Sequence, residues 1–372
     1  MSQSIDKSRS ATTQPSAPGK LPAAAIRTLV SVIIPSWRRP DLLQECLSHL
    51  TEQTIPRDNH EIIVVENEAQ PETASVVQLP ANARIIPLTE NLGTTGSVNF
   101  ALQQSSSRYV LLLNNDVELD PHFLEVLIAV LQGNPKCGFA TGKLLNARRR
   151  DTLDGAGDAL LCGGGSYRLG HDDPDHGQFD QAVPIIAGCG AATLFRRSVL
   201  DEIGGLDDDF FAYLDDVDLG LRAQLAGYQG IYTPQAVAWH LGSASLGDVF
   251  HPRIAEFLTR NQLFLLVKNY PASAFWRLLG PIALFQLLWL TLIIRRGRIW
   301  AYLRGLAGAL RRMPRMLVKH HRTMRARRIS PVQFIALLRA SERQIFLWQA
   351  GLPKNARSRL LSAYFWLFRP GK

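Results

Sequence analysis

The sequence predicts an α/β protein whose core is a doubly wound sheet. Short runs of aliphatic and β-branched residues recur through the first half of the chain, and stretches with helical apolar spacing separate them. Strand and helix alternate in this way over roughly a hundred residues, which favours a largely parallel sheet with helices on both faces. In such a sheet the ligand lies beyond the carboxyl ends of the strands. Polar residues that close the predicted strands are therefore the first candidates for a functional site.

The predicted elements follow one another in a regular order. The expected strands cover residues 29–35, 61–66, 84–88 and 108–113, and the expected helices cover 41–51 and 123–131, with a third that ends at Gln104. Further along, residues 188–198 are expected to form a strand of small residues that leads into a helix. Residues 230–240 are expected to form another strand.

The apolar run at 108–113 stops abruptly on Asn114, Asn115 and Asp116. Such a run is typical of a strand that is buried on both faces. Asp116 is then expected at the ligand edge of the sheet, where a hard cation such as Mg²⁺ or Mn²⁺ takes carboxylate and phosphate oxygens. The alternative is that these residues form only a polar strand exit, which caps a helix that begins near Pro121.

Two glycine-rich segments each allow a functional and a structural interpretation. Residues 91–96 have the composition of a phosphate-binding loop at a helix N-terminus, but they lack the known glycine signatures and are also typical of a simple turn. Residues 163–177 are too rich in glycine for a packed element, which suggests a mobile lid or an acceptor loop. The acidic and histidine side chains of this second segment either bind a metal or form a solvated loop tip.

Acidic residues are concentrated between residues 204 and 222, and Asp215, Asp216 and Asp218 crowd the start of a predicted helix. The helix dipole favours one or two carboxylates at that position. Because like charges repel, the cluster as a whole indicates that one carboxylate serves as a base. The last predicted strand ends on His240, which is either a ligand or a hydrogen-bonded core residue.

Several motifs occur in a fixed order over about residues 29–250. They are Val32-Ile-Ile-Pro-Ser-Trp37, Ile63-Val-Val-Glu-Asn67, Asn91-Leu-Gly93, Leu112-Leu-Asn-Asn-Asp-Val117, Phe210–Arg222 and Ala238–Ser245. Together they resemble the family 2 glycosyltransferases of GT-A fold, in particular the bacterial rhamnosyltransferase-like branch that assembles envelope polysaccharides. The sequence departs from the family in two places. The aspartate-x-aspartate metal motif appears as Asn114-Asn-Asp116, which leaves one metal carboxylate, and Glu66 stands where the family has a base-contacting Asp.

The resemblance implies a GT-A sheet and a reaction. A sugar of the rhamnosyl or hexosyl type would move, with inversion, from a nucleotide diphosphate donor to a lipid-linked or nascent cell-envelope glycan acceptor. Asp116 and His240 would hold Mg²⁺ or Mn²⁺ on the diphosphate. Asp216 would be the base, with Asp215 as the fallback. The residues implied for the nucleotide-sugar site are Pro35, Ser36, Glu66, Asn91 and Asn115.

Charge divides the chain into two unlike halves. Residues 1–252 contain 18 Lys/Arg and 30 Asp/Glu, whereas residues 253–372 contain 23 and 2. We therefore expect a disordered segment at 1–25, a GT-A domain at 26–250 and a basic, helical, membrane-associating region at 251–372. The four cysteines lie singly and the first 25 residues have no apolar core, which together indicate a reducing, cytoplasmic setting.

Two stretches of the basic region underlie the expected membrane association. Residues 278–294 carry no charge, but as a helix they would reach only about 25 Å of a ~30 Å hydrocarbon core, so a shallow helix, a re-entrant hairpin and a core helix are the alternatives. Residues 300–328 have the composition of an amphipathic helix on an anionic leaflet. We expect a peripheral or monotopic protein at the cytoplasmic face of the inner membrane. Nucleic acid is not an expected partner, because no nucleic-acid-binding module is recognisable.

Two other classes of function stay open at this point. A catalytically silent membrane-binding or assembly protein would keep the sheet after losing the second metal carboxylate. A basic nucleic-acid-binding protein would use the acidic half as a scaffold. Donor hydrolysis or sugar transfer separates the enzyme from both alternatives.

Overall fold

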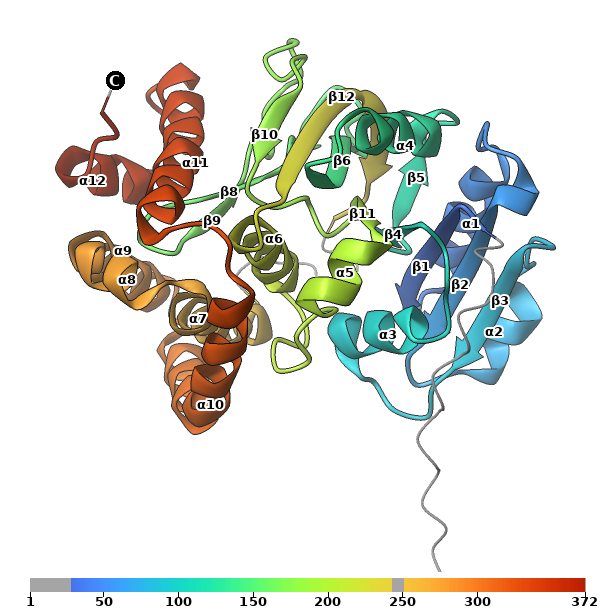
Figure 1. Cartoon of the computed structure of the whole chain (residues 1–372), viewed down its shortest axis with the longest axis horizontal. Coiled ribbons are helices and arrows are strands. Elements are labelled where there is room, and N and C mark those ends of the chain that lie inside the picture. Colours follow the sequence, from blue (N-terminus) through green and yellow to red (C-terminus); the bar gives the residue numbers. More distant parts are fainter. Residues whose placement is uncertain (1–27, 243–250, 372) are drawn as a thin grey trace, which may run out of the picture.

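The computed structural model describes residues 28–242 and 251–371. The segment at 1–25 and the predicted boundary at residue 250 lie outside these residues, as does the end of the last sequence motif, 243–245. Figure 1 shows a central sheet with helices on both faces and a group of C-terminal helices along one side of it.

The sheet is mixed, and its strands run in the order β10-β12-β6-β11-β4-β1-β2-β3, with β5 paired to β12 and β7 paired to β6. The strands are β1 (Val30–Ser36), β2 (His60–Glu66), β3 (Ala83–Pro87), β4 (Tyr109–Leu113), β5 (Val117–Leu119), β6 (Cys137–Asn146), β7 (Leu153–Gly155), β8 (Asp158–Leu160), β9 (Ser166–Arg168), β10 (Val183–Ile185), β11 (Ala192–Arg196) and β12 (Gln229–His240). Strands β8 and β9 form a separate antiparallel pair.

The direction of the strands determines at which edge of the sheet their polar carboxyl ends lie. Strands β1, β2, β3 and β4 are parallel neighbours, so their carboxyl ends meet at one edge of the sheet. Strand β11 is antiparallel to both β4 and β6, and β12 is parallel to β6. The predicted doubly wound α/β sheet is thus confirmed, and its polar strand ends lie where ligands bind in such folds.

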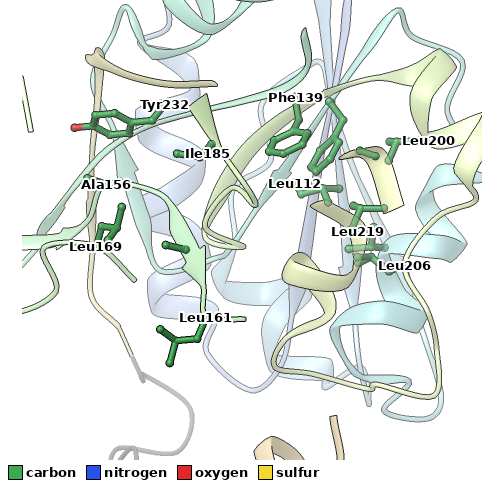
Figure 2. Close-up of a cluster of buried hydrophobic side chains, with 14 of the residues drawn as sticks. Leu112, Phe139, Ala156, Leu161, Leu169, Ile185, Leu200, Leu206, Leu219 and Tyr232 are labelled. Carbon is green, nitrogen blue, oxygen red and sulfur yellow. The ribbon is translucent and has the colours of Figure 1, made fainter. Parts of the chain in front are cut away.

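The helices are α1 (Pro40–Thr51), α2 (Pro71–Val76), α3 (Gly93–Leu102), α4 (Phe123–Gly133), α5 (Arg197–Ile203), α6 (Asp215–Leu225), α7 (Pro252–Asn269), α8 (Ala272–Arg277), α9 (Leu279–Arg295), α10 (Ile299–Ala326), α11 (Pro331–Gly351) and α12 (Arg359–Leu367). Because side chains alternate along a strand, Val32 and Ile34 of β1 face one layer while Ile33 faces the other. Helices α1 and α4 contribute to the first layer, and α3, α5 and α6 to the second. Figure 2 shows part of the second layer, with Leu112 and Phe139 from the sheet close to Leu219 of α6.

The C-terminal helices share a core with the sheet domain. Phe285 and Trp289 of α9 belong to the same buried cluster as Ile33 and Leu219. Helix α11 also reaches the β8–β9 hairpin, because the Ser341 hydroxyl accepts a hydrogen bond from the Leu160 backbone N–H at 2.8 Å. These contacts make the helices after residue 252 part of one packed structure with the sheet.

The glycine-rich segment that was expected to be a lid is held in place. Residues 163–165 form the turn of the β8–β9 hairpin, beneath α9. A Cβ atom on Gly163 would lie 2.7 Å from the Cβ of Phe285, and one on Gly165 would lie 2.3 Å from the ring of Phe285. Glycine is therefore needed here for close packing against a helix.

The uncharged stretch at 278–294 forms α9, and one face of this helix is buried. Ile282, Phe285, Trp289 and Ile293 pack inward, whereas Leu287 is 60% exposed. Among the helices that the structure describes, none is both long enough and apolar enough to cross a membrane. The basic stretch at 300–328 corresponds to α10, which packs along α7.

Candidate active site

The carboxyl ends of β1, β2 and β4 bring several predicted site residues together. The amide of Asn115, just past β4, donates to the Ser36 hydroxyl at the end of β1 at 3.2 Å. Glu66, the last residue of β2, is 4% exposed and accepts a hydrogen bond from the Gln70 backbone N–H at 3.4 Å. Parallel pairing aligns Ser36 with Glu66, so the predicted nucleotide residues share one edge.

The loop before α3 is fixed to this edge by a residue that the sequence analysis did not select. The Asn67 side-chain oxygen accepts from the Leu92 backbone N–H and from the Ser97 hydroxyl, each at 2.9 Å. Within the loop, the Asn91 side-chain oxygen accepts from the Gly93 N–H at 2.8 Å, and Gly93 has a positive φ of 70°. These bonds shape the turn that opens α3, and they engage the backbone N–H groups of Leu92 and Gly93.

Asp116 and His240 face each other across a strand pair. Strand β12 runs antiparallel to β5, which places His240 opposite Val117 and next to Asp116. The His240 Nε2 atom lies 3.3 Å from the Asp116 Oδ1 atom. Its Nδ1 atom lies 2.9 Å from Oδ2 of Asp154, a residue of β7. His240 is thus held between two carboxylates.

Protonation at this position follows from those contacts. Burial alone would lower the pKa of His240, but its hydrogen bonds to Asp116 and Asp154 outweigh burial and raise the pKa to about 9. Asp154 is affected in the opposite sense. Burial would raise its pKa, yet Arg168 and His240 together hold it well below the usual range.

The Asp116–His240 pair has a geometry that suits a shared divalent cation. Ligands about 2.1 Å from one ion and at right angles to each other are about 3 Å apart, close to the separation of these two atoms. The bond from His240 to Asp154 would also orient the imidazole, as carboxylates behind metal-bound histidines do. Among the described residues, no group of three or more His, Cys, Asp or Glu could hold an ion. Two protein ligands fit an ion whose remaining positions are filled by diphosphate oxygens and water.

Asp215 and Asp216 begin α6, as the sequence predicted. The Asp216 Oδ2 atom accepts a hydrogen bond from the Gly190 backbone N–H at 2.9 Å, and its Oδ1 accepts from the Val217 N–H at 2.8 Å. Burial raises the pKa of both carboxyls, and repulsion from Asp216 raises that of Asp215 further. The pair therefore tends to share a proton near neutral pH, and the two backbone N–H bonds favour the ionised form of Asp216.

The third carboxylate of the cluster has a structural role. Asp218 is fully buried and bonds Arg222 at 2.8 Å, Lys268 at 2.8 Å and Asn269 at 2.9 Å. Although burial would raise its pKa, Lys268 and Arg222 lower it to about 2. Asp218 is thus fully satisfied by neighbouring helices and does not face a ligand.

Arg168 connects the two groups of acidic residues. Its guanidinium bonds Asp154 at 2.8 Å and lies 3.6 Å from Asp158, and its charge also acts on Asp216. The sequence analysis did not select Asp154, Asp158 or Arg168. The segment Thr152-Leu-Asp-Gly-Ala-Gly-Asp158 does contain two carboxylates separated by small residues, which is a pattern that could have marked a site. Nothing in the local sequence, however, indicates that this segment lies near Asp116.

A cavity joins the nucleotide edge to the start of α6. Pro35 and Asn114 line it from the strand ends, Thr94 from the start of α3, and Asp215 and Asp216 from α6. Asp116 does not line this cavity and instead borders a second hollow, between α1 and β5, which Cys46 and Glu118 also line. The candidate base Asp216 and one predicted donor residue, Pro35, therefore line the same cavity.

This arrangement defines the class of the protein. S. aureus TarS aligns with 91% of this chain and 55% of its own length, with a TM-score of 0.50 and 15% sequence identity. The mixed sheet followed by helices is the GT-A type of glycosyltransferase fold, as the sequence resemblance implied.

Comparison of sequences identifies the family. A model described as glycosyltransferase like family 2 matches residues 27–259, so the chain belongs to this family of nucleotide-sugar glycosyltransferases. The N-acetylglucosaminyl-diphospho-decaprenol L-rhamnosyltransferase of Mycobacterium tuberculosis is 27% identical over 255 residues, which cover 60% of this chain and 81% of that protein. The O-antigen biosynthesis protein RfbC of Myxococcus xanthus is 31% identical over 225 residues, 58% of this chain, but the match spans only 17% of RfbC.

The environment of His240 predicts a pH-dependent stability in metal-free protein. Its folded-state pKa of about 9 lies above the ordinary value of 6.5, so protonated His240 stabilises the fold fully below pH 6.5, and this contribution is lost as the pH rises through 9. The contribution amounts to at most ~3 kcal/mol. Raised carboxyl pKa values also lower stability toward high pH, so the comparison is made with His240→Gln. Denaturant titrations in chelator should show a flatter decline for the variant between pH 6.5 and 9, and equal slopes would contradict the assignment.

Proposed function

We propose that this protein is an inverting, metal-dependent glycosyltransferase that moves a rhamnosyl or other hexosyl group from a nucleotide diphosphate donor to a lipid-linked or nascent cell-envelope glycan. The observation that carries the proposal is the chain of contacts that runs from Asp116 through His240, Asp154 and Arg168 toward Asp216. Ser36 and Glu66 are aligned at the ends of β1 and β2, and Asn115, the neighbour of Asp116 in sequence, bonds Ser36. The activity in the name of the mycobacterial relative supports the choice of sugar and acceptor class.

Donor binding follows from the strand ends. The base and the ribose of the donor nucleotide would lie over Pro35, Ser36 and Glu66, with Asn91 and Asn115 at the border of the site. Asp116 and His240 would bind Mg²⁺ or Mn²⁺ together with the diphosphate. When bound, the ion neutralises charge as the nucleoside diphosphate leaves.

The acceptor hydroxyl would lose its proton to Asp216. This carboxylate has no salt bridge among the described residues, and its backbone hydrogen bonds favour the ionised form that a base requires, against the burial that raises its pKa. Asp215 stands behind it and would take the proton only if Asp216 could not. Attack from the face opposite the departing diphosphate inverts the anomeric carbon.

A lipid-linked acceptor requires the enzyme to reach a membrane surface, and α10 has a suitable outer face. Leu303, Leu310 and Leu317 repeat every seven residues and are 43%, 60% and 51% exposed. Exposed arginines such as Arg311 and Arg322 accompany them. An apolar stripe with basic neighbours is the pattern of a helix that lies on an anionic leaflet, so we propose peripheral binding at the cytoplasmic face of the inner membrane.

The metal assignment is tested by Asp116→Asn. The substitution keeps the shape of the side chain but removes the charge that holds the cation, so turnover with Mn²⁺ should fall by about 100-fold or more. Transfer or donor hydrolysis is measured with a panel of nucleotide sugars, and circular dichroism checks that the fold is kept. Near-normal, metal-dependent turnover by the variant would refute the assignment.

The base assignment is tested by comparing two neighbouring carboxylates. Asp216→Asn should lower kcat by about 100-fold or more while donor affinity stays within about twofold, since a base acts in the transition state and does not hold the nucleotide. Asp215→Asn is the matched variant and should retain more activity. If Asp215→Asn is inactive and Asp216→Asn is active, the roles are reversed.

The membrane proposal is tested with the outer face of α10. Replacing Leu303, Leu310 and Leu317 by Gln should weaken binding to vesicles that contain phosphatidylglycerol by about tenfold or more, because buried apolar area anchors such helices. High salt should release the unmodified protein only in part, since salt screens the charges alone. The control replaces Val76 and Leu79, which are 53% and 42% exposed on the sheet domain, by Gln. Equal vesicle binding by all three proteins would exclude this face as the membrane contact.

A further inference from the structure

The loop that leads into α6 has an unusual backbone. Phe211, Tyr213 and Leu214 have positive φ angles of 68°, 68° and 62°. Residues other than glycine rarely adopt this left-handed conformation, and segments that contain it persist only where their surroundings hold them. Leu214 directly precedes Asp215, so the conformation of this loop sets the position of the first turn of α6, which carries the candidate base.

One side chain of α7 holds the loop by its backbone. The Asn261 amide nitrogen donates to the carbonyl oxygens of Phe210, Ala212 and Tyr213 at 3.2, 2.9 and 2.7 Å. Since an amide has two N–H bonds, these three acceptors share two hydrogens. Among the described side chains, Asn261 alone bonds the last two of these carbonyls.

The orientation of that amide is itself fixed. Arg260 donates to the Asn261 side-chain oxygen at 2.9 Å, which leaves the nitrogen of the amide to face the loop. Arg260 also donates to the Phe210 carbonyl at 2.6 Å. Both side chains are buried, and Asn261 is fully so. A buried, fully engaged amide of this kind is a rigid support.

The ion pairs of this segment lie on either side of the strained residues, while the rings of Phe211 and Tyr213 pack against Phe257 of α7. Upstream, Asp207 and Asp209 bond Lys319 of α10. Downstream, Asp218 bonds Lys268 one turn into α6. Between these ion pairs, the Phe211 carbonyl receives a single long bond of 3.4 Å from the Thr95 N–H. Among the described side chains, Asn261 is therefore the polar anchor of the backbone at residues 212 and 213.

We propose that Asn261 is a positioning residue for sugar transfer: it holds residues 210–214 in the left-handed conformation and thereby places Asp216 at the cleft. The inference rests on the proposed role of Asp216 as base. Asn261 itself touches neither donor nor acceptor. Its effect is on the geometry of the base, and a small displacement of a catalytic group is enough to slow a reaction strongly.

The first test compares Asn261→Ala with Gln262→Ala. Gln262 is the next residue of α7 and is 5% exposed, but its side-chain oxygen has no hydrogen-bond partner and it makes no described bond to the loop. Using the nucleotide sugar that the unmodified enzyme turns over, Asn261→Ala should lower kcat about 10- to 100-fold with donor affinity changed less than about twofold. Gln262→Ala should leave kcat within about twofold. A parallel loss of kcat and donor affinity in Asn261→Ala, or equal losses in the two variants, would overturn the proposal.

Hydrogen exchange of the full-length protein tests the same idea without a substrate. In Asn261→Ala, peptides that cover residues 206–218 should exchange faster, while peptides from β1 and β4 should be unchanged. If Asn261→Ala does not fold, Asn261→Ser, which keeps a shorter donor, is measured in its place. Should the panel of nucleotide sugars give no turnover even for the unmodified enzyme, the proposed function fails, whereas unchanged exchange over 206–218 refutes the support by Asn261.

A double-mutant cycle tests the role of the left-handed backbone directly. Glycine adopts positive φ without steric cost, so Leu214→Gly should make the loop less dependent on Asn261. The loss of kcat caused by Asn261→Ala should then be at least about threefold smaller in the Leu214→Gly background than in the unmodified enzyme. If the two effects simply multiply, Asn261 does not act by holding Leu214 in this conformation.

Discussion

The join between the catalytic sheet and the C-terminal helices depends on the buried ammonium of Lys268. It lies 2.6 Å from Asp207 and 2.8 Å from Asp218, and each of these three side chains is at most 5% exposed. A charge buried to this extent is tolerated because it is paired, and removing one partner would strand the others at a cost of ~3–5 kcal/mol. Since Asp207 lies before α6 and Asp218 lies within it, Lys268 fixes both ends of the strained loop to α7. Helix α6, which carries Asp216, is therefore held both by the sheet and by the C-terminal helices.

This interface also explains why charge divides the chain into an acidic and a basic half. Lys319 of α10 bonds Asp207 and Asp209, and Arg328 pairs with Glu202 at 2.7 Å. Many of the clustered carboxylates thus have cationic partners that arrive from more than 50 residues away in sequence. In the described part of the chain, Asp215 and Asp216 have no salt bridge, and both line the cleft. Within this acidic region, the carboxylates that are paired with C-terminal cations are structural, whereas Asp215 and Asp216 are left available for chemistry.

Local pattern was sufficient to predict the strands, because buried parallel strands are short apolar runs with polar ends. It also placed Glu66 and Asp116 at the ligand edge, since that position follows from strand direction alone. The partners of His240 could not be predicted in the same way. Asp154 reaches His240 only because β7 and β12 both pair with β6, and register between distant strands leaves no mark on local sequence. Asn261 was missed because the carbonyls that it bonds lie about 50 residues earlier in the chain. The segment 163–177 was expected to be a mobile lid or an acceptor loop, but the glycines at 163–165 serve close packing, and glycine needed for packing looks like glycine needed for motion.

The two faces of α10 show how one helix can serve both a core and an outside surface. Its inner face against α7 is formed by small residues such as Ala301, Gly305 and Ala309, and a Cβ on Gly305 would lie 2.6 Å from the Glu256 carbonyl oxygen. Close approach of the two helices therefore excludes large side chains from the inner face around Gly305. The leucines at 303 and 310 point outward, although burial in a core would stabilise each of them by about 1.5–3 kcal/mol. The sequence predicted an amphipathic helix on an anionic leaflet, and the structure adds that small residues face α7 while Leu303 and Leu310 are exposed. In our proposal, a lipid surface is where this apolar area is buried.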